Sequence, residues 1–220
     1  MVVDSFDWRK FHAGYKVKKI PKDFFLMDVL KKYLPLDGSC IELGSSPGRY
    51  LTALSRNFNY DLTGIDICNI ELTKKTLKHN SIGDVNILKG NIINYKPKKQ
   101  YDIVVSFGLI EHFKDPEQAF IHFDKFCKNE GYIVIGIPNY RYFFKIIRRL
   151  LGPHVYHNSN IMDLKKINNI VSSKYDLIYL NYYSRFYSPR FLINDFSIPW
   201  LKSRFISPYI IYIGKKYNRN

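Results

Sequence analysis

The chain has 220 residues, of which 46% are hydrophobic and 24% are charged, and this suits one globular domain with a substantial core. No apolar run is long enough to span a bilayer, and Met1–Lys10 lacks the basic and then apolar layout of a signal peptide. Both features argue against a membrane-spanning or secreted class, so we expect a cytoplasmic protein.

The formal net charge of +15 narrows the possible partners without choosing between them. It is compatible with binding to nucleic acid, to anionic lipid or to a phosphorylated small substrate. A compositional bias is an equally open explanation, because the chain is rich in Lys, Asn, Ile and Tyr together. The three cysteines, Cys40, Cys68 and Cys127, are far apart in the sequence and predict buried free thiols rather than a disulfide or a zinc site.

The first recognisable unit follows an amphipathic helix predicted over Asp23–Leu34. An apolar run that contains Glu42 leads into a turn bracketed by Gly44 and Gly48, and a helix-like pattern comes next. This order of strand, glycine turn and helix is typical of the start of a nucleotide-binding α/β domain. The third glycine of the dinucleotide fingerprint is absent.

The second predicted strand, Tyr60–Ile67, carries Asp66 at its carboxyl end. An ionised carboxylate at this place in a doubly wound sheet accepts both hydroxyls of a ribose, and the distance of about 20 residues from Gly44 fits that role. The alternative is that Asp66 caps the following helix, predicted over Ile70–Asn80.

Three more strands complete the first part of the chain. The third strand is predicted over Val85–Ile92, the fourth over Tyr101–Phe107 and the fifth over Gly131–Ile137. A helix predicted over Glu117–Cys127, opened by Pro116, joins the last two.

Six motifs in this order resemble those of class I S-adenosylmethionine (AdoMet)-dependent methyltransferases. They lie between Leu36 and about Tyr140 and read Glu-Leu-Gly-x-x-x-Gly, Gly-Ile-Asp, Gly-Asn, Tyr-Asp-x-Val-x-Ser, Glu-His-Phe-x-Asp-Pro and Gly-Tyr-Ile-Val-Ile-x-x-Pro-Asn. The chain is most similar to the group that includes ubiquinone-biosynthesis O-methyltransferases and sugar methyltransferases of surface-polysaccharide pathways. The resemblance implies a Rossmann-like α/β fold with a seven-stranded sheet, the last strand antiparallel, helices on both faces and a cap insertion after the fifth strand.

The resemblance also implies AdoMet as the cofactor and a set of residues around it. The implied cofactor-binding residues are Tyr15, Glu42, Gly44, Ser45, Gly48, Asp66, Ile67, Asn91, Ile92, Ser106 and Phe107. Similar enzymes usually have an acid at the position of Asn91, whose amide oxygen can also accept a hydrogen bond from adenine.

The whole chain is expected to form a single methyltransferase domain with four parts. Residues 1–35 would be a lid and helix, 36–140 the AdoMet-binding core, 141–174 a substrate cap, and 175–220 the closing strands with a long acceptor-side loop. A helix predicted over Arg141–Leu151 carries basic residues on one face. Arg148, Arg149 and Arg185 are the expected substrate-binding residues, because arginine pairs well with anionic groups.

Glu111 and His112 directly follow the fourth strand, whose end faces the reactive methyl group under the switch-point rule. His112 is the expected general base and His157 its helper, unless His112 only hydrogen-bonds the loop. With Glu111 they are also similar to metal-dependent relatives such as small-RNA 3′-terminal 2′-O-methyltransferases. Those enzymes carry a further Glu where this chain has Gly108, so we expect no metal and keep Mg²⁺ or Mn²⁺ as the alternative.

These features predict an AdoMet-dependent O-methyltransferase of a small anionic acceptor, such as a nucleotide-linked sugar or a phosphorylated surface-polysaccharide precursor. The alternatives are an N-methyltransferase, a phosphoramidate-type methyltransferase, an RNA methyltransferase and a basic protein with weak membrane-surface association. Nucleic acid is not the expected partner, because the Asn-Pro-Pro-Tyr-type motif of base methylation is absent.

Overall fold

The computed structural model describes residues 12, 14–139, 141, 145–146, 160, 162–183 and 207–218. Four of the predicted site residues, Arg148, Arg149, His157 and Arg185, lie outside these ranges, as does most of the helix expected over Arg141–Leu151. No helix in the described part of the chain has the length and apolar character needed to cross a membrane.

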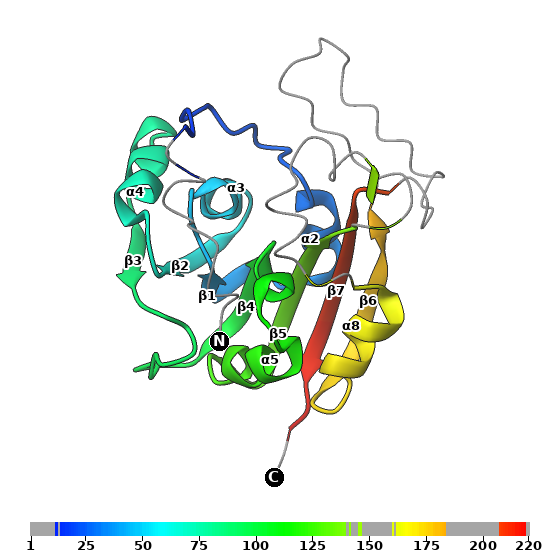
Figure 1. Cartoon of the computed structure of the whole chain (residues 1–220). Coiled ribbons are helices and arrows are strands. Elements are labelled where there is room, and N and C mark those ends of the chain that lie inside the picture. Colours follow the sequence, from blue (N-terminus) through cyan, green and yellow to red (C-terminus); the bar gives the residue numbers. More distant parts are fainter. Residues whose placement is uncertain are drawn as a thin grey trace.

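Seven strands form one sheet in the order β3-β2-β1-β4-β5-β7-β6 (Figure 1). The strands are β1 (Asp37–Leu43), β2 (Asn59–Asp66), β3 (Val85–Lys89), β4 (Tyr101–Phe107), β5 (Cys127–Pro138), β6 (Tyr175–Tyr183) and β7 (Tyr209–Lys216). Neighbours from β3 to β5 are parallel, and β7 runs antiparallel between β5 and β6. The predicted sheet with an antiparallel last strand is confirmed.

Helices cover both faces of this sheet (Figure 1). They are α2 (Met27–Tyr33), α3 (Arg49–Asn57), α4 (Ile70–His79), the 3₁₀ turn η1 (Ile110–His112), α5 (Pro116–Asp124) and α8 (Leu164–Val171). One buried cluster joins η1, α5 and α8 to the sheet, and a second joins α2 and α3 to the opposite face. The apolar strands are therefore buried on both sides, as in other parallel sheets.

The predicted helix over Asp23–Leu34 was too long at its start, because α2 begins only at Met27. Leu26 just before it has a left-handed backbone with φ 73°, which a leucine rarely adopts. Tertiary packing explains the departure: Leu26 is fully buried, and its N–H donates to the Tyr183 hydroxyl at 3.3 Å. Local helix propensity is overruled by this contact with a distant strand.

The boundary between the predicted helix Glu117–Cys127 and the predicted strand Gly131–Ile137 also shifts. The helix ends at Asp124 and β5 begins at Cys127, because Cys127 pairs with Tyr101 at the start of β4. Asp115 caps the helix by accepting hydrogen bonds from the N–H groups of residues 117 and 118, and Pro116 is the first helical residue, as predicted. All three cysteines are buried, and none forms a disulfide among the described residues, as predicted.

Asn139 ties the carboxyl end of β5 to the start of β7. Its backbone N–H donates to the carbonyl of Pro208 at 2.8 Å, and its side-chain amide donates to the carbonyl of Ser207 at 2.9 Å. At the same place, Tyr209 in β7 pairs with both Pro138 in β5 and Tyr183 in β6. Three strand ends thus meet at one point of the sheet.

The other ends of β6 and β7 are held by a charged cluster around Asp124. Its carboxylate accepts from Lys174 at 2.6 Å, from Lys216 at 2.8 Å and from the Tyr175 hydroxyl at 3.0 Å. Burial raises the pKa of Asp124, but the hydrogen bonds from the two lysines outweigh burial and hold that pKa below its ordinary value. The cluster joins the end of α5 to β6 and β7.

Replacing Asp124 by alanine should lower the free energy of unfolding by about 3 kcal/mol, because two ammonium groups lose their partner. The Lys174 side chain is 30% exposed, so its ammonium group can be hydrated when Asp124 is lost. The loss of stability should therefore lie at the low end of the range for buried ion pairs. Urea unfolding measures the change. The exposed Asp84→Ala is the control and should shift the value by less than about 0.5 kcal/mol. Equal losses in the two variants would contradict this account.

Candidate functional site

The candidate site lies where the winding of the sheet reverses, between the carboxyl ends of β1 and β4. The turn after β1 crosses the end of β2, since the N–H groups of Gly44 and Ser45 both donate to the Ile65 carbonyl at 2.9 and 3.2 Å. Gly44 and Gly48 have φ values of 78° and 91°, a left-handed region that favours glycine. The predicted glycine turn therefore has the expected backbone.

The two glycines are also required by close packing. A Cβ on Gly44 would lie 3.0 Å from a methyl group of Leu109, in the loop after β4. A Cβ on Gly48 would lie 3.1 Å from the backbone oxygen of Thr73, in α4. The glycine turn is thus pressed against the loop after β4 on one side and against α4 on the other.

Polar atoms without hydrogen-bond partners among the described residues gather at this turn. They are one carboxylate oxygen of Glu42 and the hydroxyls of Ser45 and Ser46. Glu42 is only 2% exposed, and burial, followed by the nearby Asp66, raises its pKa well above the ordinary value. Buried polar groups in proteins are normally paired, so these atoms indicate a place for a polar ligand.

Asp66 lies at the end of β2 and faces the same turn. Its two carboxylate oxygens accept from the N–H groups of Ser46 and Cys68, each at 2.9 Å. Burial raises the pKa of Asp66, and these hydrogen bonds oppose the rise. The alternative role as a helix cap is wrong, because the cap residue of α4 is Asn69 and no side chain caps that helix.

The N-terminal stretch passes over this end of the sheet, from α4 towards α2 (Figure 1). The ring of His12 lies 3.0 Å from the side-chain amide of Asn69. Tyr15 is half-buried, and burial raises the pKa of its hydroxyl while Arg49, at the start of α3, lowers it. The role of residues 1–35 as a lid and helix stays a prediction, and residues 1–11 and 13 lie outside the described part.

The remaining residues of the predicted cofactor set differ in their exposure. Ile67 is 49% exposed just beyond Asp66, whereas Ile92 is buried. β3 ends at Lys89, so Asn91 lies in the turn that follows rather than in the strand, and its amide oxygen already accepts from the Ile93 N–H at 3.1 Å. The Ser106 hydroxyl donates to the Leu43 carbonyl at 3.3 Å, and this bond links β4 to β1.

Tyr50 is a residue of this region that the sequence patterns did not single out. Its ring stacks on Phe107 with 4.1 Å between ring centroids, and its hydroxyl interacts electrostatically with both Glu42 and Glu111. An aromatic residue two positions after Gly48 was the available signal. Tyr50 joins the acid at the end of β1 to the acid that follows β4.

Glu111 and His112 lie together in η1, as their positions predicted. Glu111 is 1% exposed and His112 is 5% exposed, with 3.8 Å between the nearest carboxylate oxygen and the Nε2 atom. Burial raises the pKa of Glu111 to about 8. The backbone N–H of Asn160 donates to the Glu111 carbonyl at 2.6 Å, and its side-chain amide donates to the Phe113 carbonyl, which fixes this turn.

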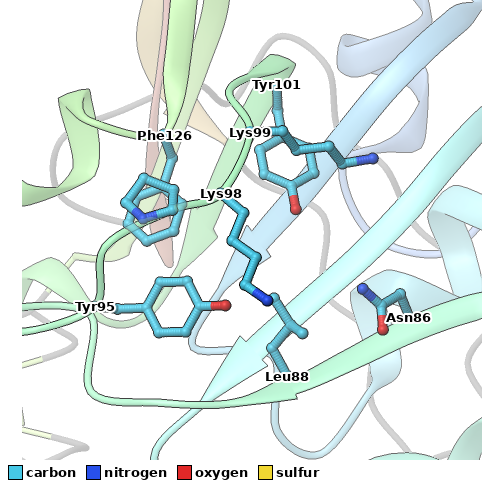
Figure 2. Close-up of a pocket in the computed structure, with 8 residues that line it drawn as sticks. Asn86, Leu88, Tyr95, Lys98, Lys99, Tyr101 and Phe126 are labelled. Atoms are coloured by element: carbon cyan, nitrogen blue, oxygen red, sulfur yellow. The ribbon is translucent and has the colours of Figure 1, made fainter.

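The described residues contain no group of three or more His, Cys, Asp or Glu side chains placed to hold a metal ion. A cavity of about 160 Å³ lies elsewhere, beside the edge strand β3 (Figure 2). Its lining residues are Asn86, Leu88, Tyr95, Pro97, Lys98, Lys99, Tyr101 and Phe126. None of them is a predicted site residue, so this cavity is separate from the glycine turn.

Residues 15–177 match the family model for a methyltransferase domain, which is most of the chain. The chain is 22% identical over 141 residues to the malonyl-[acyl-carrier protein] O-methyltransferase 2 of Ilyobacter polytropus, covering 63% of this chain and 54% of that one. It is 25% identical over 138 residues to a ubiquinone biosynthesis O-methyltransferase of Rickettsia bellii, covering 60% and 57%. The chain thus spans little more than half the length of these curated relatives.

A solved structure of an AdoMet-dependent methyltransferase from Thermotoga maritima, described as a possible histamine N-methyltransferase, has the same fold. The two structures superpose with a TM-score of 0.63 at 18% identity, and the match covers 86% of each chain. At this identity the likeness concerns the fold alone, and it agrees with the sheet order found here.

The glycine turn makes a direct test of the local geometry possible. Gly48→Ala should lower the stability by about 2 kcal/mol, because alanine is strained at a φ of 91° and its Cβ meets a backbone oxygen that cannot move aside. For a chain of this length the melting temperature should fall by about 4–8 °C. Gly83→Ala is the matched control, since a Cβ there meets nothing within 4 Å. A similar fall for both variants would contradict the packing argument.

Proposed function

The chain belongs to the class I AdoMet-dependent methyltransferases, and from this we propose that it binds AdoMet at the glycine turn and methylates an oxygen of a small anionic acceptor. The observation that carries the proposal is the group of unpartnered buried polar atoms around that turn. AdoMet has an ammonium and a carboxylate at one end and a ribose diol and adenine at the other. Both hydrogen-bond donors and acceptors are therefore needed in the site.

The residues present fit these groups. Glu42 can accept from the ammonium, and the hydroxyls of Ser45 and Ser46 can donate to the carboxylate. Gly44 and Gly48 allow the backbone to approach a ligand closely, and Tyr15 would cover that end of the site. These residues would hold the methionine part of the cofactor.

Asp66 would hold the ribose, because a carboxylate at the end of β2 can accept two more hydrogen bonds beside those from Ser46 and Cys68. The exposed Ile67 offers an apolar surface for adenine, and Asn91 and the buried Ile92 lie in the turn after β3. Ser106 and Phe107 would support the site from beneath, since both side chains are buried against β1 and α3.

When bound, AdoMet supplies a methyl group on a positively charged sulfur. The chain must hold the acceptor in line with that group and remove a proton from an acceptor hydroxyl. The Glu111–His112 pair would perform this task, and its position in the turn next to Leu109, which packs on Gly44, supports that role. His157 would assist from the segment between β5 and α8. Both curated relatives are O-methyltransferases by name, which favours oxygen as the acceptor atom.

The anionic character of the acceptor rests on charge. The net charge of +15 and the arginines Arg148, Arg149 and Arg185 favour a phosphorylated molecule, such as a nucleotide-linked sugar or a surface-polysaccharide precursor. The segments 141–174 and 184–207 would form the acceptor side of a single domain. An N-methyltransferase is the second candidate, because the Thermotoga maritima protein of the same fold is described as a possible histamine N-methyltransferase.

Asp66→Ala should weaken AdoMet binding by about 100-fold, since two hydrogen bonds to a charged acceptor, each of about 1.5 kcal/mol, are lost. Asp66→Asn should lose less, because its amide oxygen still accepts. Isothermal titration calorimetry measures both. Asp61→Ala on the same strand is the control, since its exposed carboxylate binds Lys99 instead. Binding of NAD with no response to AdoMet would reject the proposed cofactor.

Reversing Arg148 and Arg149 to Glu should raise the KM for an anionic acceptor at least tenfold and leave AdoMet affinity nearly unchanged. The matched control reverses Lys165 and Lys166, two exposed lysines of α8. Labelled AdoMet and a panel of nucleotide sugars, amino sugars, bulk RNA and a phenol provide the assay. Methyl transfer only to RNA or only to amines would contradict the proposal of a small anionic acceptor for O-methylation. Equal transfer to a neutral acceptor by the Arg148/Arg149 and the Lys165/Lys166 variants would contradict it too.

A further inference from the structure

Glu111 has an unusual environment for a carboxyl group. It is 1% exposed, and neither of its side-chain oxygens has a hydrogen-bond partner in another described residue; only its own backbone N–H acts on the carboxyl to lower its pKa. His112 does not supply one, because 3.8 Å is too long for a hydrogen bond. A carboxyl group buried in this way destabilises the fold, and groups that do so are concentrated at functional sites.

One carboxylate oxygen of Glu111 lies near Gly108, in the loop after β4. Gly108 has a φ of 70°, and among the described residues a Cβ placed on it would meet only one atom within 4 Å, the Oε1 of Glu111 at 3.7 Å. The next residue, Leu109, packs on Gly44 of the glycine turn. The space beside Gly108 is therefore bounded by the Glu111 carboxyl and adjoins the turn that would hold the methionine end of AdoMet.

Among the described residues, few titratable groups act on this carboxyl. The neighbours are the imidazole of His112 on η1 and the hydroxyl of Tyr50 on α3, which in turn interacts with Glu42, Arg49 and Tyr209. Burial is the main cause that raises the pKa of Glu111 to about 8, so the group is largely neutral at pH 7. A base with a pKa near the working pH is ionised in a useful fraction of molecules and still has a high affinity for a proton.

We propose that Glu111, and not His112, is the catalytic base that takes the proton from the acceptor hydroxyl. The O–H bond breaks and its proton moves to a Glu111 oxygen, the acceptor oxygen bonds to the methyl carbon, and the methyl–sulfur electrons return to sulfur. His112 is a positioning residue for the carboxyl. The assignment rests on the proposed function and names the base within it.

The test needs no acceptor, because AdoMet is positively charged at sulfur and S-adenosylhomocysteine is not. A positive charge beside Glu111 favours its carboxylate, so AdoMet should expel a proton that S-adenosylhomocysteine leaves in place. Calorimetry of both ligands at pH 7 in buffers of different ionisation enthalpy gives the protons released. The difference between the ligands should approach about 0.9 proton, the protonated fraction of a group with a pKa of 8. The ammonium common to both ligands cancels any response of Glu42.

In Glu111→Gln the difference should fall to zero, and binding of S-adenosylhomocysteine by this variant shows that it is folded. Glu117→Gln, the same change at an exposed position of α5, and His112→Ala should both keep the difference. A difference that persists in Glu111→Gln, or that disappears only in His112→Ala, would overturn the assignment. If wild type bound neither ligand, the proposed function would fail and this assignment with it; binding with equal proton release would reject the assignment alone.

Discussion

The contact between Gly44 and Leu109 is the constraint on which the candidate site depends. It presses the turn after β1 against the loop after β4, and a Cβ on Gly44 would be strained at a φ of 78° and would have to push the Leu109 side chain aside. The hydrogen bond from Ser106 to the Leu43 carbonyl fixes the same two strands just beneath. As a result, two buried acids that are far apart in the sequence, Glu42 and Glu111, share one neighbour, the hydroxyl of Tyr50.

Much of the fold could be predicted because local and tertiary preferences agree in it. The strands are short apolar runs that end in turn residues, and a sheet buried on both faces requires such runs. The predicted helix boundaries were wrong where a contact with a residue distant in the sequence determines the backbone conformation. Leu26 leaves the helical conformation to bury its side chain beside Tyr183, and Cys127 leaves the helix to pair with Tyr101. Neither partner can be found from the neighbouring sequence.

The candidate site divides in a similar way. The positions of Asp66 and Glu111 just after strand ends could be predicted from the sequence, whereas their roles stay predictions. Tyr50 was not found, because its place depends on stacking against Phe107 across the sheet. For Asn91, the sequence could predict an amide oxygen able to accept a hydrogen bond. It could not predict that this oxygen already accepts one from the Ile93 N–H within the turn. Choosing between Glu111 and His112 as the base needed burial and hydrogen-bond partners, which spacing does not contain.

The junction at Asn139 affects which segments of the chain can change in length during evolution. The segment that leaves β5 and the segment that joins β6 to β7 both start or finish where Pro138, Tyr183 and Tyr209 meet, and Asn139 fixes that junction. Asp124 anchors the far ends of β6 and β7. Insertions or deletions in either segment therefore leave the register of the sheet intact. A lineage could therefore exchange these two segments by recombination while the sheet itself is inherited unchanged.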